Sequence, residues 1–253
     1  MTRTNVLLVG AVLVLATFVP ASAFVFQMNS TQLQSLYEID ENPIADPGTD
    51  LFSVTPVDNG AEFWGSLNIG GSGWSQIQIG ANYFGHPYAG HEGDGASLSD
   101  LGLGNLEGYS MFSQSFQNVS KHAWHFSLFA GIGYAHERET YYYLQNEWAM
   151  IDAGMGAKLS LDFSNAEIWS WNPVTGETSH IGWNNALNLG LDWGHVSSIG
   201  FNIAGDIPVD GEGHNFRVLA TPAPEPTTLV FVGLGLLGLA FLRKKFGGSS
   251  KIN

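Results

Sequence analysis

Alternation of apolar and polar residues is the feature of this sequence that most restricts its fold. Between Ser75 and Tyr83 every second residue is apolar or aromatic, and Gln76 and Gln78 fall between them. The segment 124–134 repeats the pattern. Because successive side chains of a β-strand point to opposite faces, this period predicts antiparallel strands with one buried face and one face in water.

The same period recurs along most of the chain, in the segments 159–163, 187–193, 199–203 and 216–220. Turn-forming sequences rich in Gly, Asn and Asp separate the segments, at 58–60, 172–176 and 210–213. Short strands at this spacing predict one all-β domain over residues 24–221, an antiparallel β-sandwich with a jelly-roll-like architecture. Helical spacing is confined to 30–37 and 140–151.

The N-terminal segment 1–23 has the order of a secretory signal peptide. Arg3 precedes an apolar run from Val6 to Val19, and the small residues Ala21 and Ala23 satisfy the A-x-A rule of signal peptidase. We therefore predict cleavage by signal peptidase before Phe24. The alternative is a retained anchor, for which the apolar run is short.

The C-terminal segment has three parts in a fixed order. Pro224, Glu225 and Pro226 come first, an uncharged run at 227–242 follows, and Arg243, Lys244 and Lys245 end it. The run predicts a transmembrane helix of 16 residues, slightly below the ~20 that cross a hydrocarbon core. By the positive-inside rule the basic cluster stays in the cytoplasm, which leaves the preceding domain outside.

This order resembles the PEP-CTERM sorting signal. The resemblance covers about residues 224–245, and we assign the segment 222–253 to the signal. The resemblance implies that an exosortase in the inner membrane of a Gram-negative bacterium recognises the Pro224–Pro226 region. It also implies export to the cell surface or the extracellular matrix, since such systems accompany exopolysaccharide production. The tail after Lys245 is longer than is usual in the family, and an ordinary membrane anchor is the alternative.

Charge excludes one class of partner. Between Phe24 and Thr221 there are 22 acidic side chains against four basic ones, a net charge of −18. Such a surface repels nucleic acid, so we predict no nucleic-acid partner. The chain also has no cysteine, and therefore no disulfide, thiol nucleophile or thiolate metal ligand.

The aromatic residues of the second half suggest a ligand. Trp169 and Trp171 are two residues apart, so a strand would place both side chains on one face. Aromatic rings stack on the apolar C–H faces of sugars, which makes this pair our candidate polysaccharide-binding residues. The alternative is that both rings pack in the core or at its rim.

Carboxylates suggest a metal site. Asp206, Asp210 and Glu212 lie in a glycine-containing loop, and several hard oxygen ligands suit a structural calcium ion. The alternative is a solvated acidic turn. No other cofactor is expected, and His122 and His125 would point to opposite faces of a strand rather than to one zinc ion.

These observations predict an exported cell-envelope or exopolysaccharide-matrix protein that is not an enzyme and binds polysaccharide. The alternatives are a purely structural envelope protein, a glycan-active enzyme and a calcium-dependent adhesin. A glycosidase would need two carboxylates across a cleft, and the sequence singles out no such pair.

Overall fold

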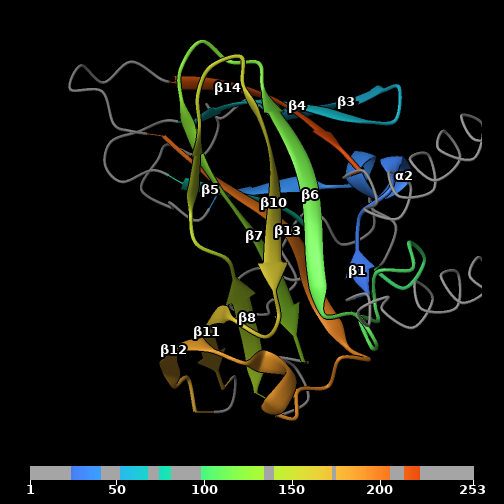
Figure 1. Ribbon diagram of the computed structural model, residues 1–253, viewed down its shortest axis with the longest axis vertical. Coiled ribbons are helices and arrows are strands. Elements are labelled where there is room, and N and C mark those ends of the chain that lie inside the picture. The colour runs from blue at the N-terminus through green and yellow to red at the C-terminus, as the bar shows by residue number, and fades with distance from the viewer. Residues whose placement is uncertain are drawn as a thin grey trace, which may run out of the picture.

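The computed structural model describes residues 24–40, 52–67, 74–80, 98–133, 140–172, 175–205 and 214–222. These residues form mostly β-strands, arranged in two sheets (Figure 1). The predicted all-β sandwich is therefore confirmed. The transmembrane helix predicted at 227–242 lies outside the described residues, and within them no helix has the length and hydropathy of a membrane span.

One sheet has six strands. On one edge of β6 lie β1 and β14, which pair with different stretches of it, and β14 is followed by β4 and then β3. On the opposite edge, β6 pairs with β10. All pairs are antiparallel except β1 with β6. The strands are β1 (Val25–Phe26), β3 (Phe52–Val57), β4 (Gly60–Leu67), β6 (Met111–Asn118), β10 (Gly156–Asp162) and β14 (His214–Thr221).

The other sheet has eight strands. Its order is β12, β11, β8, β7, β13, β5 and β2, and β9 pairs with β7. All its pairs are antiparallel. The strands are β2 (Tyr37–Asp40), β5 (Trp74–Gly80), β7 (Trp124–Ile132), β8 (Tyr141–Gln145), β9 (Ala149–Ile151), β11 (Ala166–Trp171), β12 (Thr178–Asn184) and β13 (Val196–Ala204).

The main hydrophobic core lies between the sheets and is rich in phenylalanine. Phe201 of the eight-stranded sheet meets Phe63 at 5.3 Å and Phe116 at 4.9 Å between ring centroids, both edge-on. Phe116 also stacks on Phe126 at 5.5 Å. All four side chains are buried, so the alternating apolar residues of both sheets meet here, as the sequence predicts.

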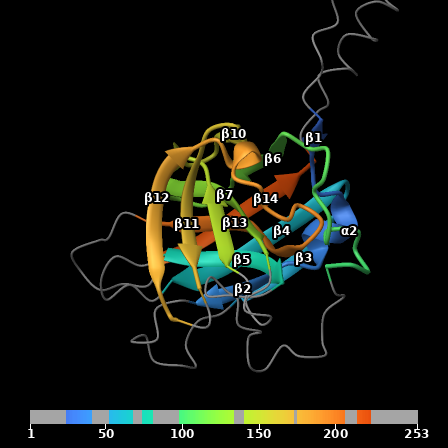
Figure 2. The ribbon, with the colours of Figure 1, turned by 90° about the horizontal axis from the view of Figure 1, so that it is seen from below.

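The prediction of one wet face per strand is wrong for the centre of the eight-stranded sheet. Gln76, Gln78, Ser127 and Asn202 point away from the main core, yet each is at most 1% exposed. The cause is the shape of the sheet, which curls so that β11 and β12 stand steeply to β5 and β2 (Figure 2). The prediction holds for β10, where Leu159 and Leu161 are buried while Lys158 and Ser160, which alternate with them, are exposed.

Two local predictions also fail. The segment 187–193 is not a strand, because Asn185 caps a 3-10 helix, η1 (Ala186–Asn188), and Gly190 follows at φ +67°. The segment 140–151 is not helical but forms β8 and β9, since its run of tyrosines favours a strand. The helical turn predicted near residue 30 is confirmed as α2 (Ser30–Gln34), which a reciprocal capping box of Asn29 and Gln32 begins.

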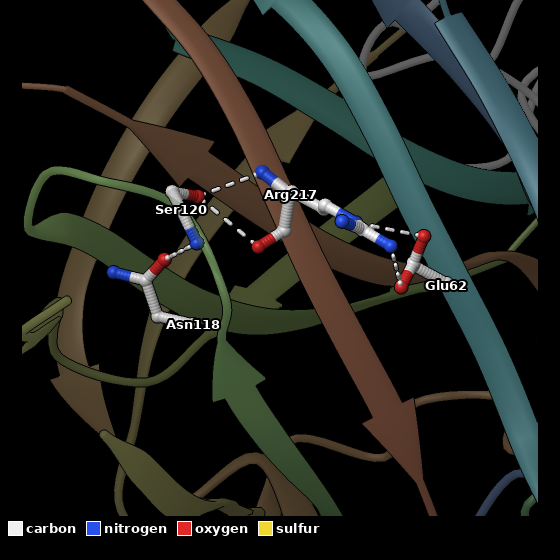
Figure 3. Close-up of polar contacts among 4 residues, drawn as sticks. All are labelled: Glu62, Asn118, Ser120 and Arg217. Carbon is white, nitrogen blue, oxygen red and sulfur yellow. Dashed lines mark hydrogen bonds and ion pairs between the residues drawn. The ribbon is translucent and has the colours of Figure 1, made fainter. Parts of the chain in front are cut away.

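The last strand, β14, is fixed at its middle and ends abruptly. Arg217 makes a two-pronged ion pair with Glu62 at 2.9 and 3.0 Å, and its backbone exchanges hydrogen bonds with the hydroxyl of Ser120 (Figure 3). At the end of β14, Thr221 pairs with Ser115 of β6. β1 already pairs with the next stretch of β6, so the chain leaves the sheet at Pro222.

Candidate functional site

The face of the eight-stranded sheet that points away from the main core carries the candidate site, and we name it the curled face. Residues directly opposite each other in antiparallel strands point to the same side, so the register defines its members. They combine amide, hydroxyl and aromatic side chains: Gln76, Gln78, Ser127, Phe129, Tyr141, Tyr143, Gln145, Glu167, Trp169, Trp171, His180, Trp183, Ser198 and Asn202.

Tyr143 is the hub of this face. Its hydroxyl oxygen accepts hydrogen bonds from Gln76 Nε2 at 2.9 Å and from Asn202 Nδ2 at 2.8 Å, and Asn202 also donates to Ser127 Oγ at 2.9 Å. In a flat sheet β8 and β5 would lie about 14 Å apart, three strand spacings. The direct contact between Tyr143 and Gln76 therefore shows how strongly the sheet curls.

A second tyrosine crosses the same face. The hydroxyls of Tyr141 and Ser198 are hydrogen-bonded at 2.8 Å, above Gly131 of the intervening strand. The ring of Tyr143 stacks on Phe129 at 5.1 Å. Together these side chains form a small second core, against which Trp169 and Trp171 pack.

Tyr37 of β2 extends the polar part of the face. It is hydrogen-bonded to the side chain of Gln78 and donates to the backbone oxygen of Gly80. Burial raises the pKa of the Tyr37 phenol, and these two hydrogen bonds oppose the rise only in part. The phenol is thus held neutral well into the alkaline range.

The two predicted ligand-binding tryptophans do lie on one face, and both are half-buried. Trp169 is held on two sides: it meets Tyr143 edge-on at 6.0 Å and stacks nearly parallel on the imidazole of His180 at 4.8 Å. His180 thus covers one face of the Trp169 ring. A role for either tryptophan in ligand binding stays a prediction.

The tryptophans are joined by three residues that the sequence did not single out, namely Glu167, Gln145 and His180. Glu167 Oε1 lies 3.1 Å from His180 Nε2, and Gln145 Nε2 donates to Glu167 Oε2 at 3.2 Å. Trp183 lies opposite Glu167 and is 49% exposed, one of the largest exposed rings among the described residues.

A bulge in β12 brings His180 to Trp169. The register slips by one residue beside Ile168 and Trp169, so that Gly182 pairs with Ile168 and His180 with Trp169. Gly182 has φ +80°, a conformation that favours glycine. The bulge re-aims His180 onto the curled face. The one signal in the sequence was the glycine inside a strand pattern, which often marks a bulge.

The curled face combines aromatic rings with amide, hydroxyl and carboxylate side chains. Aromatic rings offer flat apolar surfaces, and planar amide and carboxylate groups offer hydrogen-bond acceptors and donors beside them. On the described part of strands β7, β8, β11, β12 and β13, Glu167 is the one carboxylate of this face.

The other predicted site residues lie outside the described part of the chain. This applies to the calcium candidates Asp206, Asp210 and Glu212, to Ala21 and Ala23, and to the sorting residues from Pro224 onward. Within the described part, no three His, Cys, Asp or Glu side chains gather as a metal site would require.

Comparison with known proteins adds a match at the end of the chain. Residues 222–245 match the family model of the PEP-CTERM protein-sorting motif. The chain matches no curated protein. Among solved structures it is similar to "The crystal structure of an agarase, AgWH50C", with 12% identity, a TM-score of 0.35, and coverage of 73% of this chain and 24% of that chain.

At that TM-score the agarase carries no inference about this protein. The sorting motif does, because its residues are matched directly and begin where β14 ends, at Thr221. The motif implies a bacterial protein that is exported and held at the membrane or surface, and recognition by an exosortase. The chain thus carries a PEP-CTERM protein-sorting motif at residues 222–245.

Proposed function

We propose that this protein is a non-catalytic component of the cell envelope or exopolysaccharide matrix of a Gram-negative bacterium. In this proposal a signal peptidase removes residues 1–23, and an exosortase sorts the domain by its C-terminal motif. The domain then binds polysaccharide through the part of the curled face on β8, β11 and β12. The supporting observation is the cluster of tryptophan rings with Glu167, Gln145 and His180 on that face.

The rings of this cluster have different parts in the proposal. Trp169 is covered by His180, so it holds that imidazole and its neighbour Glu167 in place. Trp171 and Trp183 supply the stacking surfaces. Trp171 lies four residues along β11 from the partner of Trp183, about 13 Å away at ~3.3 Å per residue. A ligand that touches both rings must therefore be a chain of sugars.

Charge supports a neutral or cation-balanced glycan as ligand. The segment 24–221 carries a net charge of −18, which disfavours nucleic acid and anionic lipid headgroups. The hydroxyls of a sugar, by contrast, both donate and accept hydrogen bonds, and the pair of Glu167 and Gln145 offers both roles.

Affinity electrophoresis tests the proposal. Full-length protein in neutral detergent is run in gels with and without exopolysaccharide purified from the producing bacterium. We expect retardation of the wild type, and about tenfold weaker binding on Trp171→Ala or Trp183→Ala, since stacking on an aromatic ring is lost. Met155→Ala is the control, because Met155 is 60% exposed but lies outside the curled face.

Each rival function has its own outcome. Release of reducing ends from the exopolysaccharide, abolished by Glu167→Gln, would identify a glycan-active enzyme. An absence of retardation by any envelope glycan would favour a purely structural role. Retardation that survives both tryptophan changes would place the binding surface elsewhere.

A structural calcium ion at Asp206, Asp210 and Glu212 is a separate part of the proposal. It rests on their spacing in a glycine-containing loop. An ion that binds only the folded state raises the unfolding temperature. We therefore expect a higher Tm in calcium chloride than in chelator, and no such difference after Asp206→Asn with Asp210→Asn. The same rise in the double variant would refute this site, and calcium-dependent retardation would support an adhesin.

A further inference from the structure

Two fully buried amide oxygens distinguish the centre of the curled face. Gln76 Oε1 and Asn202 Oδ1 have no hydrogen-bond partner among the described residues, although the two side chains are 0% and 1% exposed. The residues lie directly opposite each other in β5 and β13. Buried polar atoms are almost always hydrogen-bonded, so a pair of unpartnered acceptors at one place needs an explanation.

The donors of both amides are already used. Gln76 Nε2 and Asn202 Nδ2 donate to the hydroxyl oxygen of Tyr143, which leaves the oxygens as the unused ends of both groups. If the nitrogen and oxygen of one amide were exchanged, Tyr143 would donate its one hydrogen to that amide, and the oxygen of the other amide would still have no bond to Tyr143.

The surroundings of these oxygens select the chemistry of a ligand. Their hydrogen-bonded neighbours are the neutral hydroxyls of Tyr143 and Ser127, with no charged group bonded to them among the described residues. A divalent cation prefers carboxylate ligands, and an anion would meet two acceptors. Neutral hydrogen-bond donors, such as two hydroxyls of a sugar, would satisfy the two oxygens, one hydroxyl for each.

Tyr143 connects this place to the proposed saccharide-binding surface. Its hydroxyl holds the two amides, and its ring meets Trp169 edge-on at 6.0 Å. The amides therefore lie one side chain away from the tryptophan cluster. Because both oxygens are buried, a ligand hydroxyl reaches them only when side chains of the curled face move aside.

We propose that Gln76 and Asn202 form a specificity subsite, in which each amide oxygen accepts a hydrogen bond from a hydroxyl of the bound saccharide. This subsite rests on the proposed saccharide-binding function. It predicts strong discrimination against ligands that lack the hydroxyl, since a site with buried polar groups rejects analogues that leave those groups unpaired.

Gln76→Met tests the subsite, because methionine has nearly the shape of glutamine without its polar atoms. The full-length protein in neutral detergent is titrated calorimetrically with cellohexaose, xylohexaose, mannohexaose and the purified exopolysaccharide. For the probe that the wild type binds, we expect at least tenfold weaker affinity in Gln76→Met. The thermal midpoint should stay the same or rise, since an unpartnered buried acceptor has been removed.

Gln114→Met is the matched control. Gln114 lies on β6 of the other sheet, is fully buried, and also has an unpartnered Oε1 and one donated hydrogen bond, to the backbone oxygen of Thr221. The same chemical change there should leave affinity unchanged. If Gln76→Met does not fold, the wild type is titrated with the O-methylated form of the bound probe, which should bind at least tenfold more weakly.

The outcomes separate the two proposals. A Kd of Gln76→Met within twofold of the wild type, with binding still lost in Trp171→Ala, overturns the subsite alone and leaves its oxygens to a buried water molecule. Equal affinity of the wild type for the O-methylated and unmodified probes also overturns it. Failure of the wild type to bind any of the four probes overturns the saccharide-binding function, and the subsite with it.

Discussion

Gly131 leaves room on the curled face for a hydrogen bond that a larger residue would prevent. A Cβ at this position would lie 2.2 Å from the hydroxyl oxygen of Tyr141 and 2.4 Å from Oγ of Ser198, well inside contact distance. These two atoms are hydrogen-bonded to each other at 2.8 Å. The absence of a side chain here is thus a packing requirement of the second core.

Gly131→Ala should therefore destabilise the domain by about 2 kcal/mol, in the usual range for overpacking a buried site. The measurement is the free energy of unfolding in urea. Gly104→Ala is the control, because the nearest atoms to its added Cβ lie 3.7 Å away, and we expect it to change stability by less than about 0.5 kcal/mol. Equal effects of the two substitutions would contradict the account of the second core.

Tyr37 gives the stability a dependence on alkaline pH. Its pKa is raised in the folded state, chiefly by burial, while the unfolded phenol titrates near its ordinary value of about 10. Above that pH the unfolded chain loses the proton and the folded one keeps it. The contribution of the neutral phenol to the free energy of unfolding is therefore fully present below pH ~10 and falls as the pH rises beyond that value.

Tyr37→Phe should remove this part of the pH dependence. We expect the variant to be less stable than the wild type at pH 8, because it lacks the hydrogen bonds to Gln78 and Gly80, and the difference to shrink at pH 11. Urea unfolding at both pH values measures it. Tyr109→Phe is the comparison, and a constant difference for Tyr37→Phe across the range would refute the assignment.

At the scale of single elements, β14 depends on contacts with two neighbours. The hydroxyl of Ser120 accepts a hydrogen bond from the backbone N–H of Arg217 at 2.7 Å. The backbone N–H of Ser120 in turn donates to the side-chain oxygen of Asn118 (Figure 3). On the other side, the ion pair with Glu62 raises the pKa of the Arg217 guanidinium. Because this ion pair is exposed, we expect the hydrogen bonds with Ser120 to contribute more to the stability of β14 than the ion pair does.

Ser120→Ala should lower the free energy of unfolding by about 1 kcal/mol, the net value of a typical hydrogen bond. Lys121→Ala, an exposed change in the same turn, should have no effect. Hydrogen exchange adds a local readout, since the amide of Arg217 should lose protection in Ser120→Ala. Unchanged protection there would show that β14 does not need this contact.

At the scale of the whole molecule, both ends of the domain lie along β6. Val25 pairs with Met111 and Thr221 with Ser115, so the chain enters and leaves the six-stranded sheet within a few residues of one strand. β11 and β12 lie at another end of the molecule, away from β14 (Figure 1). An anchor at the sorting motif would leave the tryptophan cluster away from the point of attachment.

Cell fractionation tests the sorting of the whole chain. We expect full-length protein in the envelope fraction, and release of the same domain into the periplasm or medium when the chain is cut before Pro224. The N-terminal signal and the sorting motif act separately, so the truncated protein should still be exported. Recovery of both forms in the cytoplasm would refute export, and intact mass of the envelope form would show whether the tail is removed.

Local sequence determined several parts of this protein. The sorting motif could be read directly, because it is a linear signal that needs no fold to be recognised. Five of the fourteen strands in the described residues followed from period-two alternation, since the main core needs an apolar residue at every second position; these are β5, β7, β10, β13 and β14. The hairpin turn at Asp58 and Asn59 followed from local backbone chemistry, with Asn59 at φ +60°.

Only the tertiary structure decided what happens on the curled face. Gln76 and Asn202 read as solvent-facing residues, and nothing local reveals that Tyr143 reaches Gln76 across two intervening strands and Asn202 across one. Likewise, His180 meets Trp169 because of a one-residue slip in β12. Alternation specifies that a strand has two faces, but the curvature of the sheet, a sum of contacts between distant segments, determines whether the second face meets water or another strand.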